Sequence, residues 1–383
     1  MWSSLKSSTP TVCSATSTIA PFSASTKTIT LWVAPLFLTM CESDIKFAVG
    51  TYTVLGGEGV LIYSLNPRTL QAECLGRHRV ENPSFLCASP SGGHVYAVNE
   101  SGSQSGVHHL AVDENGALTA CQTVASGADP CHILWLSPRT LCISNYSGGS
   151  VELFDIAADG SLSASAQTLT FHECGTSPRQ QSSHIHFCAI TPDGEYLVAD
   201  DLGGDCIHIL KIEHHTDGTA RLLRHGKTAV HPEAGPRHIC FGADGRFAYL
   251  ITELSDEVMV FGYNSGALSL IQTLTAAPMP AHASGHIMVH PNGKWLYASV
   301  RRTGDGIAVY HIGDDGRLTQ VGYTHTALHP RHFNITPDGS LLLCACRDSD
   351  TIEVYRINPA DGTLLDTRHH ISVAKAVCIQ FID

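Results

Sequence analysis

The chain of 383 residues repeats one short unit along most of its length, and this repeat limits its possible folds more than any other feature. A tight turn, usually followed by Leu, occurs seven times, at residues 68–70, 115–118, 159–162, 217–218, 265–268, 315–318 and 361–364. A second series of turns alternates with the first, at residues 90, 138, 192, 243, 291 and 337, in steps of 48, 54, 51, 48 and 46 residues. Self-similarity at such a spacing is typical of repeat architectures.

The residues around each turn alternate between apolar and polar in short stretches rich in β-branched and aromatic side chains, as in residues 247–251 and 295–299. This period of two residues predicts strands, and no stretch sustains the spacing of an amphipathic helix. A repeat of about 50 residues built only from short strands is typical of a β-propeller blade. We therefore predict an all-β, seven-bladed β-propeller with four antiparallel strands per blade.

The two ends of this repeat are expected to meet. The 343 residues that follow residue 40 divide into seven units of 49. A strand at residues 47–50 precedes the first full unit, so we expect the N-terminal strand to pair with C-terminal strands and close the ring. Closure of this kind leaves no exposed sheet edge at the seam.

The first 40 residues have a different composition from the rest. Residues 1–39 are rich in Ser and Thr, contain no acidic residue, have only Lys6 and Lys27 as cations, and end in an apolar run over residues 29–38. The run has the length of a signal-peptide core, but its lead-in is long and weakly basic, and Met40 is an alternative start. We predict that residues 1–40 are a leader or a spurious N-terminal extension outside the domain, and that residues 41–383 form the propeller. No other run approaches the ~20 apolar residues of a membrane span.

Charge and cysteine usage narrow the partners and the compartment. The 23 Lys and Arg against 35 Asp and Glu give a formal net charge of −12, which argues against nucleic acid or an anionic membrane as a partner. The 14 Cys are scattered through apolar runs without a C-x-x-C pair, which indicates buried thiols in a reducing, cytoplasmic compartment. Nothing in the sequence separates a monomer from a homodimer.

Candidate functional residues recur at equivalent points of the blades. The first strand of a blade lines the channel and the second runs antiparallel to it, so the start of the first and the end of the second meet at one face. Second-strand ends carry Asp201, Glu253 and Arg301. First-strand starts carry His132, His184, His186, Arg237, His238, His286, Arg331 and His332. We predict that these groups converge on one channel mouth and bind a small anion.

The number of residues between each of these histidines and the following turn is not the same in every blade. Three of the histidines, His238, His286 and His332, lie five residues before their turn, whereas His132 and His186 lie six before theirs. A shift of one residue turns a side chain to the other face of a strand unless a bulge absorbs it.

Structural roles for these groups stay open. Each histidine can equally be a plug that bonds a backbone carbonyl, and Arg237 can be a structural ion pair with Glu253. The His184 and His186 pair has a spacing that can hold zinc, but no third ligand is within reach in the sequence, so we predict no metal and no other cofactor. G-x-S-x-G, P-loop and H-E-x-x-H motifs are absent from the sequence, so covalent serine hydrolysis and nucleotide-driven chemistry lack support.

Ten strings of the sequence resemble the lactonase family of seven-bladed propellers, the group that contains bacterial 6-phosphogluconolactonase and fungal 3-carboxy-cis,cis-muconate cyclase. They span residues 47 to 381 in the family's order: VGTYT (49–53), NPSFL (82–86), YAVNE (96–100), NYSGGSVELF (145–154), HIHFCAITPDG (184–194), DLGGD (201–205), GPRHICF (235–241), TELSDEVMVF (252–261), LYASVRRTGDGIAVY (296–310) and HPRHFNITPDG (329–339). The chain departs from the family at Val300, where Asn is usual, and at Cys346-Arg347, where Asn-Gln is usual.

The resemblance implies an enzyme whose catalytic residues are His186, Arg237, Glu253 and Arg301. For substrate binding we predict His132, His184, Asp201, His238, His286, Arg331 and His332. The implied reaction is hydrolysis of a small anionic sugar lactone, above all 6-phospho-D-glucono-1,5-lactone to 6-phosphogluconate in the pentose phosphate pathway. Either Glu253 or His186 would take the proton from water, and Arg237 and Arg301 would hold the oxyanion and the phosphate. Two alternatives are a carboxymuconate cycloisomerase and a non-catalytic binding scaffold.

Overall fold

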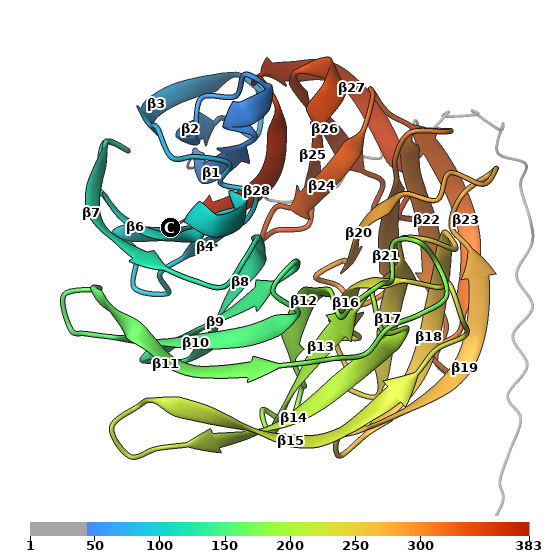
Figure 1. Ribbon diagram of the computed structural model, residues 1–383. Coiled ribbons are helices and arrows are strands. Elements are labelled where there is room, and N and C mark those ends of the chain that lie inside the picture. The colour runs from blue at the N-terminus through green and yellow to red at the C-terminus, as the bar shows by residue number, and fades with distance from the viewer. Residues whose placement is uncertain (1–43, 383) are drawn as a thin grey trace, which may run out of the picture. The chain divides into compact units, whose positions relative to one another are not determined.

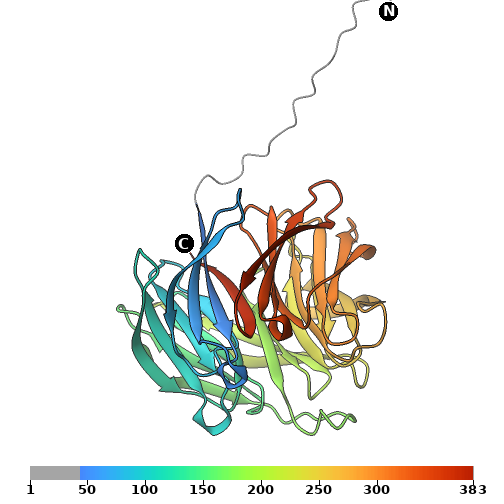
Figure 2. The same cartoon turned by 90° about the horizontal axis from the view of Figure 1, so that it is seen from above.

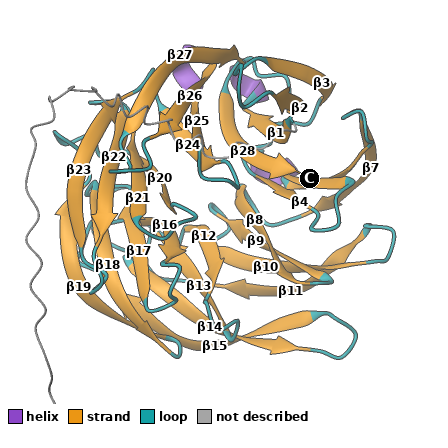
Figure 3. Ribbon diagram, turned by 180° about the vertical axis from the view of Figure 1, so that it is seen from behind, coloured by secondary structure: helices purple, strands orange, loops and turns teal. Residues whose placement is uncertain are grey.

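The structure, a computed structural model, describes residues 44–382, so the predicted leader at residues 1–40 lies outside the described residues. Seven sheets, each of four antiparallel strands, stand around a central channel (Figure 1). This arrangement confirms the predicted all-β propeller. The helical elements within residues 44–382 are three short 3₁₀ turns, η1 (Thr53–Leu55), η2 (Gly102–Gln104) and η3 (Arg347–Ser349), seen in purple in Figure 3.

Within each blade the strands follow one another from the channel outward. The first three blades are β28 (Ala376–Ile382), β1 (Ile45–Thr51), β2 (Val60–Leu65) and β3 (Ala72–His78); β4 (Leu86–Ala88), β5 (His94–Asn99), β6 (Gly106–Val112) and β7 (Leu118–Ala125); and β8 (Pro130–Ser137), β9 (Thr140–Asn145), β10 (Ser150–Ile156) and β11 (Leu162–Thr170). The next two are β12 (Ile185–Ile190), β13 (Tyr196–Asp201), β14 (Cys206–His214) and β15 (Ala220–Ala229); and β16 (Pro236–Phe241), β17 (Phe247–Thr252), β18 (Glu257–Asn264) and β19 (Ala267–Thr275). The last two are β20 (Ser284–Val289), β21 (Trp295–Val300), β22 (Gly306–Ile312) and β23 (Leu318–His325); and β24 (Pro330–Ile335), β25 (Leu341–Cys346), β26 (Thr351–Ile357) and β27 (Leu364–Ser372).

The core lies between neighbouring blades. Second strands such as β9 and β25 are buried along their whole length, whereas the outermost strand β11 is mostly exposed. Apolar side chains of one sheet pack on those of the next, as Ile251 of β17 packs with Ala298 of β21 in one cluster. Burial of this apolar surface at every interface, worth roughly 25 cal/mol per Å², is the main force that holds the blades together.

The repeated Gly turns join each blade to its neighbour. Gly316, in the hairpin between β22 and β23, has φ +76°, a left-handed conformation that glycine adopts at little cost. Its carbonyl accepts a hydrogen bond of 3.2 Å from the Tyr249 hydroxyl of the preceding blade. Tyr297 makes the same bond to Gly362 at 2.7 Å. The turns that reveal the repeat in the sequence therefore also fix the spacing of the blades.

The seam is closed as the sequence predicts. β1 pairs antiparallel with β28, with Phe47 opposite Phe381 and Val49 opposite Ile379, so one blade takes strands from both ends of the chain. Figure 2 shows the blue N-terminal strands beside the dark red C-terminal ones. Every described strand thus belongs to a four-stranded blade, and opening the ring would require breaking a complete strand pair.

Candidate active site

A β-bulge at the start of the innermost strands decides which side chains face the channel mouth. In β16, Pro236 pairs with Thr252 and His238 pairs with Ile251, so Arg237 is the extra residue between them. The same shift occurs in β8, β12 and β24, where the extra residues are Cys131, His186 and Arg331. These four side chains therefore occupy equivalent places in their blades.

The bulges correct one expectation, that His186 is equivalent to the other strand-start histidines. The residue of β12 that pairs as His238 does in β16 is Phe187, and His186 lies one place earlier. His132 has the same six-residue spacing to its turn, but a second bulge further along β8 absorbs the extra residue. One residue of register moves a side chain to the other face, so His186 and His132 belong to different layers.

The channel next to the mouth is filled by aromatic rings. His238 and His286 share a hydrogen bond of 2.8 Å between their Nδ1 atoms, and His286 stacks on His332 with ring centroids 4.3 Å apart. The ring of His132 lies 4.6 Å from that of Phe85. Burial lowers the pKa of His132 and His332 to about 3, so both rings are neutral at neutral pH. These four histidines, predicted to bind substrate, are outside the lining of the cavity at the mouth.

The mouth holds a polar cavity of about 320 Å³. Its lining carries five arginines against two glutamates, so it is locally cationic in a chain whose formal net charge is −12. Neighbouring charges of one sign in a confined site attract a ligand of the other sign. The lining residues are Tyr52, Glu100, Cys131, Tyr146, Arg179, His186, Glu253, Arg301, Arg302, His329, Arg331 and Arg347.

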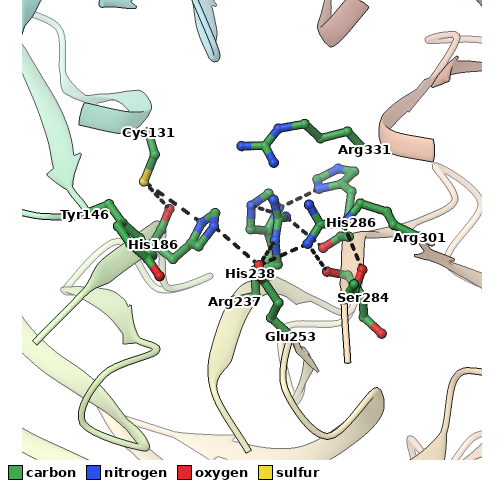
Figure 4. A network of polar contacts seen from close by, with 12 residues as sticks. Cys131, Tyr146, His186, Arg237, His238, Glu253, Ser284, His286, Arg301 and Arg331 are labelled. Atoms are coloured by element: carbon green, nitrogen blue, oxygen red, sulfur yellow. Dashed lines mark hydrogen bonds and ion pairs between the residues drawn. The ribbon is translucent and has the colours of Figure 1, made fainter. Parts of the chain in front are cut away.

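Glu253 is the centre of the charged groups at this mouth (Figure 4). Its Oε2 accepts from Nε of Arg237 at 2.8 Å and lies 3.1 Å from Nη2 of Arg301 and 3.8 Å from Nε2 of His186. Its Oε1 accepts from Nη1 of Arg179 at 2.8 Å. Three successive blades and the connection before β12 therefore place three guanidinium groups and one imidazole around a single carboxylate.

Opposing effects set the protonation states of Glu253 and His186. Burial alone would raise the pKa of Glu253, but Arg301, Arg237, His186 and Arg179 hold it well below its ordinary value. Burial and the charge of Arg237 hold the pKa of His186 well below its ordinary value. At neutral pH the site therefore presents an ionised carboxylate beside a neutral imidazole, which can accept a proton.

Arg237 and Arg301 are held by backbone as well as by Glu253. Nη1 of Arg237 donates to the Gly285 carbonyl and to Nε2 of His238, both at 2.8 Å. Nε and Nη2 of Arg301 donate to the carbonyls of Ala283 and Ser284 at 2.7 and 2.8 Å. Burial lowers the pKa of Arg301 to about 9, which still leaves its guanidinium charged at neutral pH. Their donors are largely engaged within the protein, and Arg237 is absent from the cavity lining.

Arg331 is presented to the cavity by an aromatic support. Its guanidinium carbon lies 5.0 Å from the centre of the Tyr52 ring, and its Nη2 donates to the Tyr52 hydroxyl at 2.6 Å. That hydroxyl donates in turn to Oε2 of Glu100 at 2.9 Å. Burial raises the pKa of Tyr52, so the phenol keeps the proton that this chain requires. The remaining donors of Arg331 face the cavity that it lines.

The other two predicted site residues, His184 and Asp201, are not in the lining either. Asp201 is fully buried, and its Oδ1 accepts from the backbone N–H groups of His184, Gly203 and Gly204 at 2.8 to 3.0 Å. His184 stacks on Tyr146 with centroids 4.4 Å apart, and its Nδ1 lies 3.0 Å from the Tyr146 carbonyl oxygen. The pair therefore holds Tyr146 in place beside the cavity.

The histidine pair considered for zinc is engaged elsewhere, because His184 faces the Tyr146 carbonyl and His186 faces Glu253. Within residues 44–382, the group of side chains with metal-ligand spacing is Asp201, Cys206 and His208, which lies outside the cavity lining.

Sequence reasoning missed several lining residues. Arg179 lies in the long connection between β11 and β12, which has no strand periodicity to align with other blades. The length of that connection was the available signal, since long loops in compact domains are usually functional. Arg347, at a point where the sequence departs from the lactonase pattern, also lines the cavity. The second departure, Val300, is fully buried and is not in the lining.

Fold and site together define a closed seven-bladed β-propeller with a cationic cavity at one channel mouth. The sequence profile of the family described as "Lactonase, 7-bladed beta-propeller" matches residues 46–381. The chain belongs to this family. Within residues 44–382, no helix is both long and apolar enough to cross a membrane.

Individual relatives agree with this assignment. A 6-phosphogluconolactonase of Formosa agariphila is 31% identical over 329 residues, which cover 82% of this chain and 93% of the relative. The structure of a candidate 6-phosphogluconolactonase from Bacteroides fragilis has a TM-score of 0.86 and 41% identity, covering 89% of this chain and 99% of that one. The periplasmic gluconolactonase of Pseudomonas aeruginosa has a TM-score of 0.84 and 29% identity, covering 89% and 99%.

Proposed function

We propose that the protein hydrolyses a sugar lactone, and that the substrate is 6-phospho-D-glucono-1,5-lactone, as in the pentose phosphate pathway. The observation that carries the proposal is the cavity whose lining holds five arginines together with the carboxylate of Glu253 and the neutral imidazole of His186. A volume of about 320 Å³ lies at the lower end of the range of roughly 300–1,000 Å³ for small-molecule sites. The names of the relatives agree with a lactone substrate.

The arginines of the cavity differ in their exposure and in how many N–H donors are free to bind a substrate. Arg302 is exposed and Arg347 is half-buried, so both are accessible to a charged group that enters from solvent. Nε and Nη2 of Arg347 already donate to the Asp348 carboxylate at 2.8 and 3.0 Å, so Arg347 would offer the phosphate its Nη1. Arginine binds phosphate at two points through its planar fork. We assign the phosphate of the substrate to these two side chains, and the carbonyl oxygen of the lactone to the more deeply held Arg331.

His186 is the base in this mechanism. Both oxygens of Glu253 already accept from arginines, whereas Nε2 of His186 has only the distant Glu253 Oε2 at 3.8 Å. The neutral imidazole takes a proton from water as the water oxygen attacks the lactone carbonyl. Glu253 stabilises the imidazolium that forms, and the proton then passes to the ring oxygen as the C–O bond breaks. Arg237 and Arg301 keep Glu253 ionised and in position.

Turnover of three freshly prepared lactones tests the proposal: the phosphorylated gluconolactone, gluconolactone itself and carboxymuconolactone. We expect turnover above the spontaneous rate, fastest with the phosphorylated compound. Arg331→Ala and His186→Gln should each lower kcat about 100- to 1000-fold, the usual effect of losing an oxyanion donor or a general base. Arg246→Ala, an exposed arginine outside the cavity, is the matched control. Wild-type rates in both variants would refute the assignment, and faster turnover of carboxymuconolactone would favour a cycloisomerase-type substrate.

We also propose a cytoplasmic location. All 12 cysteines of the described residues are free, which suits a reducing compartment. Immunodetection of the protein in cytoplasmic and exported fractions tests this, and recovery in the exported fraction would refute it.

A further inference from the structure

A second group of reactive side chains lies on the fourth blade. Nε2 of His208 is 3.2 Å from Oδ2 of Asp201 and 3.7 Å from Sγ of Cys206. Oε2 of Glu173, from the connection between β11 and β12, lies 3.7 Å from the same nitrogen. Asp201, Cys206 and His208 are all buried. The proposed lactone chemistry uses none of these four side chains.

The ligand atoms of Asp201, Cys206 and His208 lie within 4.8 Å of one another, as ligands of one metal ion do, and Glu173 adjoins this group through His208. Zinc bonds of about 2.0–2.2 Å to nitrogen and oxygen and 2.3 Å to sulfur, arranged tetrahedrally, place ligand atoms roughly 3.3–3.6 Å apart. The distances from His208 Nε2 to Asp201, Cys206 and Glu173, which are 3.2, 3.7 and 3.7 Å, are close to these values. Thiolate and imidazole together favour zinc over magnesium or calcium, which prefer oxygen ligands.

The fold prepares the site on both sides of Asp201. Three backbone N–H groups bind Oδ1 and leave Oδ2 directed at His208. A Cβ on Gly204 would lie 2.5 Å from the Glu173 Cβ and 2.8 Å from Asp201 Oδ2, so glycine keeps this space open. The ring of Phe171 stacks on His208 with centroids 3.9 Å apart and fixes its orientation.

The charges of these side chains also favour the binding of a cation. Asp201 and Glu173 bring two carboxylates to one buried thiol and one imidazole, and the ammonium group of Lys227 lies on the outer side, 3.0 Å from Oε1 of Glu173. A divalent ion between the four side chains, together with the Lys227 ammonium group, would balance both carboxylates and the thiolate. On binding, the Cys206 thiol releases its proton to solvent, so the site takes up metal more tightly as the pH rises.

We propose that Asp201, Cys206, His208 and Glu173 bind one Zn²⁺ ion in a structural site. Four protein ligands leave no open position for a substrate, which is the mark of a structural rather than a catalytic zinc. The ion would tie Glu173 to β13 and β14. Since Glu173 and Arg179 belong to the same connection, the ion would also steady the segment that brings Arg179 to Glu253.

Metal content of the full chain, purified without a polyhistidine tag, tests the site. Chelator-treated protein is titrated with zinc and dialysed, and we expect one equivalent to be retained. Cys206→Ser and His208→Ala should each weaken zinc binding by more than about 100-fold, because even partners outside the ligand shell are worth roughly 10- to 100-fold. His214→Gln, an exposed histidine on the same strand, is the matched control. Cobalt in place of zinc should show a thiolate charge-transfer band that Cys206→Ser abolishes.

Two further measurements keep the test decisive if a buried variant folds poorly. Glu173→Gln changes a partly exposed loop residue, and it should lower zinc affinity while the chelator-treated protein stays folded, with only the small loss of stability expected from its pair with the exposed Lys227. Trypsin cleavage after Arg179 should slow when zinc is added to the wild type and should be unaffected in Cys206→Ser. No retained zinc in the wild type, or equal binding by the wild type and all three ligand variants, would overturn the proposal.

Discussion

The charge of Glu253 is removed with little change of shape by Glu253→Gln. Residue Glu253 is 7% exposed, and it neighbours Arg237, which is 2% exposed, and Arg301, which is 5% exposed. An amide cannot neutralise these guanidinium groups, so the substitution leaves two buried cations without their counter-ion. The change is informative because it separates the charge of Glu253 from its packing.

The expected loss follows from this burial. Breaking a buried ion pair by removing one partner costs about 3–5 kcal/mol, because the remaining charge is no longer compensated. An exposed pair contributes roughly 0–1 kcal/mol. The matched control is Glu257→Gln, which removes an ion pair with His231, whose side chain is 46% exposed. We expect Glu253→Gln to lower the free energy of unfolding by about 3–5 kcal/mol and Glu257→Gln by less than about 1 kcal/mol.

The pH dependence gives the same experiment an internal check. The pKa of Glu253 in the folded protein lies well below its ordinary value. Its contribution to stability is therefore complete above the unfolded pKa of about 4.3 and is lost as the pH falls towards the folded value. The stability difference between wild type and Glu253→Gln should be constant at neutral pH and shrink below roughly pH 4.

Urea titrations at several pH values measure this difference, with the apparent Tm as a second readout. At about 2 °C per kcal/mol for a chain of this size, Glu253→Gln should lower the Tm by roughly 6–10 °C. If Glu253→Gln is no more destabilising than Glu257→Gln, or if their difference does not depend on pH, the carboxylate is not the electrostatic centre of the mouth and the reasoning fails.

The base, the glycine turns and the seam can each be tested as well. With His186 as a neutral base of lowered pKa, kcat/KM should stay level at neutral pH and fall only in acid, and a midpoint near the ordinary histidine value of about 6.5 would contradict this. Gly203→Ala should cost about 1–3 kcal/mol, measured by urea titration, because its Cβ would overlap the Ser182 carbonyl oxygen, whereas Gly226→Ala, with open space around it, should be near neutral. Deleting β28 should abolish cooperative thermal unfolding because it removes the innermost strand of the seam blade, and a chain that still unfolds cooperatively would show that closure is dispensable.

Much of the candidate site could be predicted from positions in the repeat. Glu253 and Arg301 follow the ends of β17 and β21, and antiparallel pairing brings such residues to the face where the innermost strands begin. The prediction that Glu253 and Arg301 lie at the same face therefore did not require the distance between the blades. Arg331 was found by the same reasoning and lines the cavity.

Other parts of the site depended on local irregularities. The extra residue at the start of β12 exchanges the faces of His186 and Phe187, and the number of residues to the next turn does not reveal whether a second bulge compensates. Asp201 is the last residue of β13, and Glu253 directly follows the last residue of β17, so the two have similar places in the repeat. Three backbone N–H groups nevertheless turn the Asp201 carboxylate away from the mouth.

The sequence by itself determined the propeller, because alternation within each strand and the Gly turns are local and each blade repeats them. Which side chains of the connections reach the channel mouth was decided only by the tertiary structure. Arg179 reaches Glu253 because its connection is anchored by Gln180, which donates to the Leu202 carbonyl and to Asp205 at 2.8 and 2.7 Å. Contacts of this kind join residues that no periodicity relates, so the path of such a segment emerges only once the blades have packed.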